Sequence, residues 1–369
     1  MALAIGIVGL PNVGKSTLFN ALLGHAQAAA ENYPFCTIEP NLGVVPVPDE
    51  RLVRLSAMFR PGKTTFTSLE FVDIAGLVAG ASRGEGLGNQ FLSHIRQVDA
   101  VAHVLRCFED PDVVHVSGDP DPRGDRDVVE TELMLKDLEQ LEKRREKAAK
   151  DAKAPGKAGE PARAELAVID AVKAGLEAGL PVRAQKLSTD ARGLVRHLQL
   201  LTDKPVLYIA NVDERQLADP ADAKVAQVKA LAAAEGAPCV VICGKVEAEL
   251  NDLDPPERGE YLKTLGLEEP GLMRLVRAGY QFLGLVTFFT VGPVECRAWT
   301  VRAGTRAPQA AGAVHTDFER GFIKAEVVRA LDLVAAGSEH AAREKALLRV
   351  EGREYVVQDG DVIHFKFNV

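Results

Sequence analysis

The sequence predicts an α/β protein with a doubly wound, mostly parallel sheet, an inserted α-helical hairpin and a small α+β domain at the C-terminal end. Three observations support this prediction. Short apolar runs alternate with helical patterns over most of the chain. A segment rich in Glu, Lys, Ala and Leu breaks this alternation, and closely spaced strand patterns begin near residue 285. At 369 residues, the chain is long enough for two or three domains.

Five apolar runs are expected to form the strands of the main sheet. The first, Leu3–Val8, is rich in Ile and Val, as a strand buried on both faces should be. The other four are flanked by turn signals and cover Leu69–Asp73, Ala100–Cys107, Pro205–Asn211 and Cys239–Cys243. Residues 1–122 and 200–280 are therefore assigned to the sheet domain.

A helical insert is expected between these two parts, over residues 123–199. Over residues 127–178 the composition shifts to strong helix formers, and a Pro-Gly pair divides the segment into two helical runs. Leu135, Leu138 and Leu141 recur at three-residue spacing, which predicts one apolar stripe. An antiparallel helical hairpin follows from these features.

The last part of the chain, residues 284–367, is expected to form a separate small domain of α+β class. Its helical segment is predicted over Phe322–Leu331. Its strands are predicted over Val286–Val291, Trp299–Val301, Leu347–Val350, Tyr355–Val357 and Val362–Phe367.

Composition and charge exclude several classes of protein. No run of about 18 apolar residues is present, so no membrane span is expected. The N-terminus lacks the basic stretch of a signal peptide. The five cysteines have no zinc-site or disulfide spacing, which indicates reduced thiols and a cytoplasmic protein. The net charge of −8 disfavours a DNA-coating surface. Nothing in the sequence demands a dimer, so a monomer is expected.

A phosphate-binding motif follows the first apolar run. Gly9, Gly14, Lys15 and Ser16 match the P-loop pattern Gly-x-x-x-x-Gly-Lys-Ser/Thr in full. The glycines let backbone N–H groups approach phosphates, and the next helix points its positive end at them. Lys15 should neutralise the β- and γ-phosphates with a solvent-facing head group in the empty site, and Ser16 should bind Mg²⁺. ATP or GTP hydrolysis is therefore expected, with a purely structural glycine turn as the alternative.

A second element completes the predicted phosphate and magnesium site. The second apolar run ends in Asp-x-x-Gly, so Asp73 can reach Mg²⁺ through water and the Gly76 N–H can sense the γ-phosphate. Thr37, between the two motifs, is placed to be a second hydroxyl ligand of Mg²⁺. The glycine-rich residues 80–88 predict a nucleotide-dependent switch, with a passive flexible loop as the alternative.

The residues after the fourth apolar run affect whether the site prefers adenine or guanine. GTP-specific P-loop proteins carry Asn-Lys-x-Asp there, and its Asp accepts hydrogen bonds from guanine. In Asn211-Val212-Asp213-Glu214, Glu214 adds a methylene and Val212 lacks the lysine stem that covers the base. ATP is therefore expected to be preferred, with a repositioned Asp213 or Glu214 that still recognises guanine as the alternative. Cys243 begins the loop expected over the base edge.

The sequence does not identify the group that positions the attacking water. Leu77 stands where many related proteins carry a glutamine, so slow intrinsic turnover is expected. Asn12 is a candidate ligand for K⁺ at the phosphates, with a turn-forming role as the alternative. His115 is a candidate catalytic group, and His94 a weaker one, against surface placement. His103, inside an apolar run, is expected in the core.

These motifs resemble the Obg-like ATPase (YchF) family of translation-factor-related P-loop NTPases. The similar segments are Gly9–Leu22, Pro34–Asn41, Asp73–Ser82 and Asn211–Glu214. The segments His315–Val327 and Gln358–Asn368 resemble the TGS domain, a ubiquitin-like fold also found in threonyl-tRNA synthetase. The resemblance covers essentially the whole chain.

The resemblance implies a cytosolic ATPase associated with the ribosome or with RNA. By position, it implies that Ser16 and Thr37 bind Mg²⁺ and that Asn211 and Val212 meet adenine. It also implies that the phosphates are held by Asn12, Val13, Gly14, Lys15, Ser16 and Thr17.

A cluster of cations on the helical insert bears on partners. Its members are Lys143, Arg144, Arg145, Lys147, Lys150, Lys153 and Lys157. They predict contact with ribosomal RNA phosphates, with a solvated helix face carrying Glu139–Lys143 and Glu146–Lys150 pairs as the alternative. Three functions remain open: a ribosome-associated ATPase switch, a GTPase of the same fold, or a nucleotide-dependent RNA- or protein-binding regulator with incidental hydrolysis.

Overall fold

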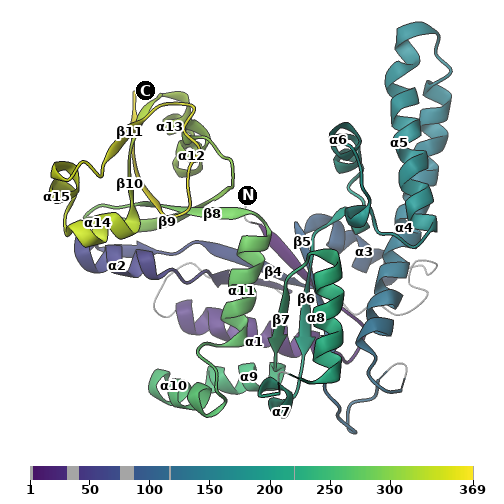
Figure 1. Ribbon diagram of the computed structural model, residues 1–369, viewed down its shortest axis with the longest axis horizontal. Helices are drawn as coiled ribbons and strands as arrows, with labels where there is room; N and C mark the ends of the chain where they lie inside the picture. The colour runs from purple at the N-terminus through teal and green to yellow at the C-terminus, as the bar shows by residue number, and fades with distance from the viewer. Residues whose placement is uncertain (1–2, 31–40, 75–86, 116–117, 220, 369) are drawn as a thin grey trace.

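The structure is a computed structural model that describes residues 3–30, 41–74, 87–115, 118–219 and 221–368. A six-stranded sheet at its centre has the strand order β2-β4-β1-β5-β6-β7 (Figure 1). Its strands are β1 (Ala4–Val8), β2 (Leu42–Pro46), β4 (Ser68–Asp73), β5 (Ala100–Arg106), β6 (Val206–Asn211) and β7 (Cys239–Ile242). Neighbours are parallel except for β2 with β4, which confirms the predicted doubly wound, mostly parallel sheet.

Both faces of the sheet are covered. Consecutive residues of β1 show this, because their side chains point to opposite faces. On one side, Ile5 lies against Gly279 of α11 (Gly271–Phe282). On the other side, Gly6 lies close to Ile74 and Val98. Ile5 and the middle of β6 are fully buried, so the apolar core that the strand patterns predict lies on both faces.

The insert forms the predicted antiparallel hairpin, which projects from the sheet domain (Figure 1). Its long helices are α4 (Pro122–Asp151) and α5 (Glu160–Glu177). Leu141 is fully buried between them, but Leu135 is 38% exposed. The stripe predicted at three-residue spacing is therefore wrong for Leu135. The buried positions Leu133, Asp137 and Leu141 follow four-residue spacing, which keeps them on one side of a helix.

A short connection returns the chain from the hairpin to the sheet. It contains η2 (Val182–Ala184), α6 (Thr189–Leu198) and η3 (Leu201–Asp203). Ser188 caps α6 by accepting a hydrogen bond from the Ala191 N–H at 3.2 Å. Asp137 of α4 accepts hydrogen bonds from the N–H groups of Leu201 and Thr202, both at 2.8 Å. These bonds fix the connection against the base of the hairpin.

The C-terminal part is α+β, as predicted. Its strands are β8 (Leu285–Thr290), β9 (Glu295–Arg302), β10 (Phe322–Arg329), β11 (Arg349–Glu351) and β12 (Asp361–Phe367). Its helices are α12 (Ala307–Val314), α13 (Thr316–Arg320), α14 (Ala330–Ala336) and α15 (Glu339–Glu344). The second sheet has the strand order β11-β10-β12-β8-β9-β3, in which β3 is Lys63–Thr65.

Two sequence predictions for this part are wrong. The helix predicted over Phe322–Leu331 is the strand β10, paired between β11 and β12, and the helix α14 begins only at Ala330. A register shift between Phe322 and Lys324 interrupts the two-residue alternation, so the apolar residues mimic helical spacing. The strand predicted over Tyr355–Val357 is reduced to a single bridge.

The second sheet includes a strand from the N-terminal half of the chain. This strand, β3 (Lys63–Thr65), pairs in parallel with β9. Leu52 and Leu55 of α2 (Glu50–Phe59) are fully buried in a core that they share with Phe289. Arg51 Nη1 lies 2.6 Å from Asp359 Oδ2. Residues 50–65 therefore pack as part of the C-terminal domain.

Two findings concern the described part of the chain as a whole. None of its helices is both long and apolar enough to span a bilayer. Its Cys, His, Asp and Glu side chains also form no group of three or more that could hold a metal ion.

Candidate nucleotide site

The phosphate-binding loop joins β1 to α1 (Lys15–Ala30), and glycines shape both of its ends. Gly14 has a φ of +92°, and an added Cβ there would lie 2.2 Å from Asn211 Nδ2. At Gly9, an added Cβ would lie 2.6 Å from the carbonyl oxygen of Val104. Only glycine allows both contacts. The loop therefore turns tightly into the start of α1, whose first N–H groups have no partner within the helix.

Lys15 is buried, which corrects the expectation of a solvent-facing head group. The residue is 7% exposed, and its Nζ donates a hydrogen bond to the Leu10 carbonyl oxygen at 2.7 Å. Burial lowers the pKa of Lys15 to about 8, and the nearby carboxylate of Asp73 opposes this shift. The ammonium is thus held inside the loop, where a triphosphate would replace the carbonyl as its partner.

Oxygen donors suited to Mg²⁺ lie beside Lys15. Asp73 ends β4, and its Oδ1 is buried with no hydrogen-bond partner among the described residues. Burial raises the pKa of this carboxyl group, and the Lys15 ammonium acts against the shift. Ser16 is exposed in the first turn of α1. Mg²⁺ prefers oxygen ligands and keeps several waters, so this donor set fits the ion together with nucleotide phosphates. Thr37 and Gly76 lie outside the described residues.

A pocket of about 440 Å³ lies next to the loop. Gly14 and Thr17 line it on the phosphate side, and another wall consists of Phe108, Glu109, Asp110 and Val113. Its remaining lining includes the predicted base-binding residues Asn211, Val212, Glu214 and Cys243. The structure therefore brings the phosphate loop and the predicted base motif into one cavity, within the usual size range of small-molecule sites.

Asn211 connects the two parts of this cavity. The residue is 3% exposed, its Nδ2 donates to the Val13 carbonyl at 2.8 Å, and its Oδ1 accepts from the Gly244 N–H at 3.1 Å. Val212 is buried beside it, and Cys243 is buried at the start of α9 (Gly244–Asp252). Asn211 thus fixes the position of the phosphate loop relative to the loop expected at the base edge.

Asp213 and Glu214, the two acidic residues of the base motif, differ in their hydrogen bonds and in their exposure. Asp213 caps α7 (Glu214–Leu217), since its Oδ1 accepts a hydrogen bond from the Gln216 N–H at 2.9 Å. In return, the Asp213 N–H donates to the side-chain oxygen of Gln216. Glu214 is exposed at the start of this helix. The Oδ1 atom of Asp213 is therefore used as a helix cap, and Asp213 and Glu214 both line the cavity.

The candidate catalytic residue His115 lies on the loop that follows β5, and the candidate K⁺ ligand Asn12 of the phosphate loop contacts the same loop. His115 is buried, and its Nε2 lies 2.9 Å from Oδ2 of Asp125 on α4. Burial raises the pKa of Asp125, and the His115 hydrogen bond counteracts this shift. Asn12 is exposed at a φ of +62°, and its Nδ2 donates to the Val114 carbonyl at 3.0 Å. This bond leaves the role of the Asn12 oxygen, on which the K⁺ hypothesis depends, untested.

Arg106 is a site residue that the sequence reasoning missed. It is 2% exposed, and its guanidinium donates to the carbonyls of Val113 at 2.9 Å, Phe108 at 3.2 Å and Asn12 at 3.4 Å. It also stacks over the Phe108 ring. Arg106 therefore holds one wall of the base cavity against the phosphate loop. The sequence signal that could have identified Arg106 is its charge at the end of an otherwise apolar strand.

Sheet order, loop geometry and the joined base cavity together define a P-loop nucleoside triphosphatase. A family model described as "50S ribosome-binding GTPase" matches residues 4–151. A second model, for the C-terminal domain of YchF GTPases and described as a protein of unknown function, matches residues 285–368.

Whole-chain relatives narrow this class to one family. The "Ribosome-binding ATPase YchF" of Bacillus subtilis is 51% identical, and that of Escherichia coli O157:H7 is 50% identical, each over 100% of both chains. The solved "Schizosaccharomyces pombe YchF GTPase" is 38% identical with a TM-score of 0.90, over 99% of this chain and 97% of that one. A GTP-binding protein of Pyrococcus horikoshii, at 21% identity and TM-score 0.62 over 99% and 100%, supports the fold alone. The chain belongs to the YchF family.

Proposed function

We propose that this protein is a Mg²⁺-dependent ATPase that works as a nucleotide-dependent switch on the ribosome. The observation that carries the ATP assignment is the base motif. Asp213 is used as a helix cap, and Glu214 is the longer acid in place of the guanine-reading Asp. The names of the bacterial relatives support ATP and the ribosome. GTP is the second candidate, because the solved Schizosaccharomyces pombe relative is called a GTPase.

In this proposal the chain's residues bind and orient the triphosphate. Backbone N–H groups from Asn12 to Thr17 hold the phosphates, and Lys15 neutralises their charge. Ser16 and Thr37 would hold Mg²⁺ as hydroxyl ligands, and Asp73 would hold it through water. The ion supplies charge neutralisation between the β- and γ-phosphates. The Gly76 N–H senses the γ-phosphate. Adenine enters the cavity beside Val212 and Cys243.

His115 is the proposed group that orients the attacking water in place of glutamine. It would have to leave its buried contact with Asp125, which adds a cost to each turnover and supports slow intrinsic hydrolysis. His115→Ala should lower kcat while leaving ATP affinity unchanged. Unchanged kcat in a folded variant would remove His115 from the mechanism. A K⁺ ion at the phosphates is the other candidate, and replacement of K⁺ by Na⁺ during the same assay tests it.

The base assignment is tested by calorimetric titration of the full chain with ATP and GTP, each with Mg²⁺. Tighter binding of ATP is expected. The Glu214→Asp variant should gain affinity for GTP, because the shorter acid regains the guanine-reading geometry. Lys15→Met keeps the apolar stem and should abolish binding of both nucleotides. Tighter binding of GTP by the unaltered chain would overturn the ATP assignment.

The hairpin supplies the proposed ribosome contact. Lys143 forms the predicted pair with Glu139 at 2.7 Å, while the predicted pair of Glu146 with Lys150 is not among the ion pairs of the described residues. Arg144 and Arg145 pair across the hairpin with acids of α5. Four exposed cations form no such pair within the described residues, namely Lys147, Lys150, Lys153 and Lys157. They are available for RNA phosphates.

Co-sedimentation with ribosomes tests this contact. The double variant Lys147→Glu and Lys150→Glu should bind ribosomes more weakly and with a smaller salt dependence. The double variant Lys229→Glu and Lys263→Glu changes exposed lysines of α8 (Ala223–Glu235) and α10 (Pro255–Thr264) and is the charge-matched control. An equal loss of ribosome binding in both double variants would indicate a general charge effect.

A separate measurement compares ATP turnover with and without ribosomes. Turnover that ribosomes leave unchanged would favour a nucleotide-dependent binding protein with incidental hydrolysis.

A further inference from the structure

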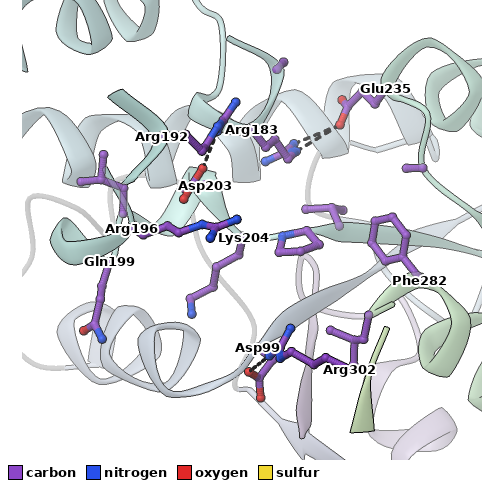
Figure 2. Close-up of a pocket in the computed structure, with 16 residues that line it drawn as sticks. Asp99, Arg183, Arg192, Arg196, Gln199, Asp203, Lys204, Glu235, Phe282 and Arg302 are labelled. Atoms are coloured by element: carbon purple, nitrogen blue, oxygen red, sulfur yellow. Dashed lines mark hydrogen bonds and ion pairs between the residues drawn. The ribbon is translucent and has the colours of Figure 1, made fainter. Parts of the chain in front are cut away.

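A second cavity, of about 850 Å³, lies at the amino end of strand β6, and the nucleotide site lies at the carboxyl end of this strand. Figure 2 shows the residues that line the second cavity. The strand β6 contributes to both sites: Asn211, at its carboxyl end, lines the base pocket, while Val206, at its amino end, lines this cavity. Five residue steps of about 3.3 Å separate the two positions by roughly 17 Å. The cavity is therefore separate from the site assigned to ATP.

Three parts of the chain meet at this cavity. The sheet domain contributes Asp99 and Lys204, the insert contributes Arg192 and Arg196, and the C-terminal domain contributes Arg302 of β9. Figure 2 shows these side chains around one space, with Lys204 near its middle. A molecule bound here would contact all three parts at once.

Cations outnumber carboxylates around the cavity. The cations are Arg183, Arg192, Arg196, Lys204 and Arg302. The carboxylates are Asp99, Asp203 and Glu235, and each already has a cationic partner. Arg192 lies 2.8 Å from Asp203, Arg183 lies 3.1 Å from Glu235, and Arg302 lies 3.4 Å from Asp99. The acids of the lining therefore neutralise only part of its positive charge.

Two of the cations have no ion-pair partner within the described residues. Arg196 is exposed on α6 and forms no such pair. Lys204 donates its Nζ hydrogen bonds to the carbonyl oxygens of Arg96, at 3.1 Å, and Val98. These carbonyls satisfy donors but carry no net charge, and burial lowers the pKa of Lys204. The carboxylates of Asp99 and Asp203 act on Lys204 without forming an ion pair with it, and a negatively charged ligand group would add a direct counter-charge at Lys204 and Arg196.

A buried donor also lies in the wall of the cavity without a partner. Arg183 is only 12% exposed at its side chain, and its Nη1 forms no hydrogen bond within the described residues. The other two guanidinium nitrogens of Arg183 are used: Nε donates to Glu235 at 3.2 Å, and Nη2 lies 2.8 Å from Glu130 and 3.1 Å from Glu235. Buried donors are rarely left unsatisfied in native proteins. Because this Nη1 atom is itself buried, Arg183 contributes positive charge to the wall and not a free donor on the cavity surface.

Apart from Gln199, the rest of the lining is apolar and suits the non-polar part of a small molecule. Leu200, Val206, Ala237, Phe282 and Leu283 contribute it. The volume of the cavity lies within the range of roughly 300–1,000 Å³ that is typical of small-molecule sites. A concave site with an apolar wall and a few converging cations differs from the flat basic surface that a nucleic-acid duplex needs.

We propose that this cavity binds a small phosphorylated compound, with its phosphate groups at Lys204 and Arg196 and a ring or other apolar group against Phe282 and Leu283. Phosphate is the class of anion indicated, because one such group carries the charge needed by two neighbouring cations. Since the ligand contacts all three parts of the chain, its binding fixes the insert and the C-terminal domain relative to the sheet domain. The proposal does not depend on which nucleotide occupies the P-loop.

Calorimetric titration of the full chain tests the proposal. The P-loop is first saturated with Mg²⁺ and a non-hydrolysable ATP analogue, so that added phosphates bind elsewhere. Inorganic pyrophosphate then probes the cations alone, and AMP probes the cations and the apolar wall together. One equivalent of each should bind. Lys204→Gln and Arg196→Ala should each weaken pyrophosphate binding by at least about tenfold, the effect of losing one charge-assisted bond.

The control is Lys186→Ala, an exposed lysine of the same connecting segment that does not line the cavity. Its binding should equal that of the unaltered chain. Arg196 is on the surface of α6, so its replacement keeps the proposal testable if the Lys204 variant does not fold. Three results would overturn the proposal: no binding of either probe at millimolar concentration, binding unaffected by both variants, or binding of an RNA oligonucleotide at these residues without either small probe.

Discussion

The buried imidazole of His103 predicts a specific loss of stability at mildly acidic pH. As expected from the sequence, His103 lies in the core: it is 1% exposed, and its ring stacks on Tyr208 at a centroid distance of 5.9 Å. Its Nε2 is buried with no hydrogen-bond partner among the described residues. Burial lowers the pKa of His103 from 6.5 to about 3, and the Arg126 and Arg183 guanidiniums add to the shift.

The sign and size of the effect follow from proton linkage. Between pH 6.5 and pH 3 the unfolded chain binds a proton at His103 and the folded chain does not. The contribution to stability is therefore fully present above pH 6.5 and is lost as the pH falls towards 3. With these two pKa values, lowering the pH from 7 to 5 reduces the free energy of unfolding by about 2 kcal/mol.

The His103→Phe variant isolates this contribution, because phenylalanine keeps the stacked ring on Tyr208 and removes the titrating nitrogens. Urea unfolding of both proteins, followed by far-ultraviolet circular dichroism, should be measured at pH 7 and pH 5. The unaltered chain should lose about 2 kcal/mol more than the variant. Other titrating groups cancel in this difference. Equal losses would refute the reasoning, since they would mean that His103 titrates alike in the folded and unfolded chains.

Three further predictions concern the site, the domain contact and the hairpin. Asn211→Ala should weaken ATP binding by roughly 10- to 100-fold in calorimetric titration, because two buried hydrogen bonds between the loops are lost; unchanged affinity would contradict this role. Arg51→Ala should lower the melting temperature of the C-terminal domain by a few degrees, reported by the single tryptophan, whereas Arg54→Ala should not. Leu141→Ala should cost about 2–5 kcal/mol in urea unfolding and Leu135→Ala less than about 0.5 kcal/mol; equal costs would contradict the observed hairpin packing.

The central sheet was predictable because its middle strands carry their own signal. Strands such as β5 and β6 are buried on both faces, so they are continuous apolar runs in the sequence. The edge strand β2 was missed, since only alternate residues of it are buried. The strand β3, Lys-Thr-Thr, has no apolar pattern and pairs with a segment far along the chain. No local rule detects such a strand.

The candidate site was predictable where its chemistry depends on short spacing. The phosphate loop is defined by residues 9–16, so their order alone specifies it. The contacts of Arg106 and the His115–Asp125 pair instead join elements that meet only in the folded chain. The burial of Lys15 was missed for the same reason. Its hydrogen bond to the Leu10 carbonyl depends on the curvature of the loop and not on the motif.

The pairing of β3 with β9 has a consequence for the order of events during synthesis of the chain. The Thr65 hydroxyl can donate its hydrogen bond to Glu295 only after Glu295, 230 residues later in the chain, has been synthesised. At about 5–20 residues per second, translation leaves residues 50–65 without their partners for roughly 10–50 s. The apolar side chains of Leu52 and Leu55 are exposed during this interval. A nascent chain of this kind needs protection, or a slow final docking step, after most of its nucleotide domain has already formed.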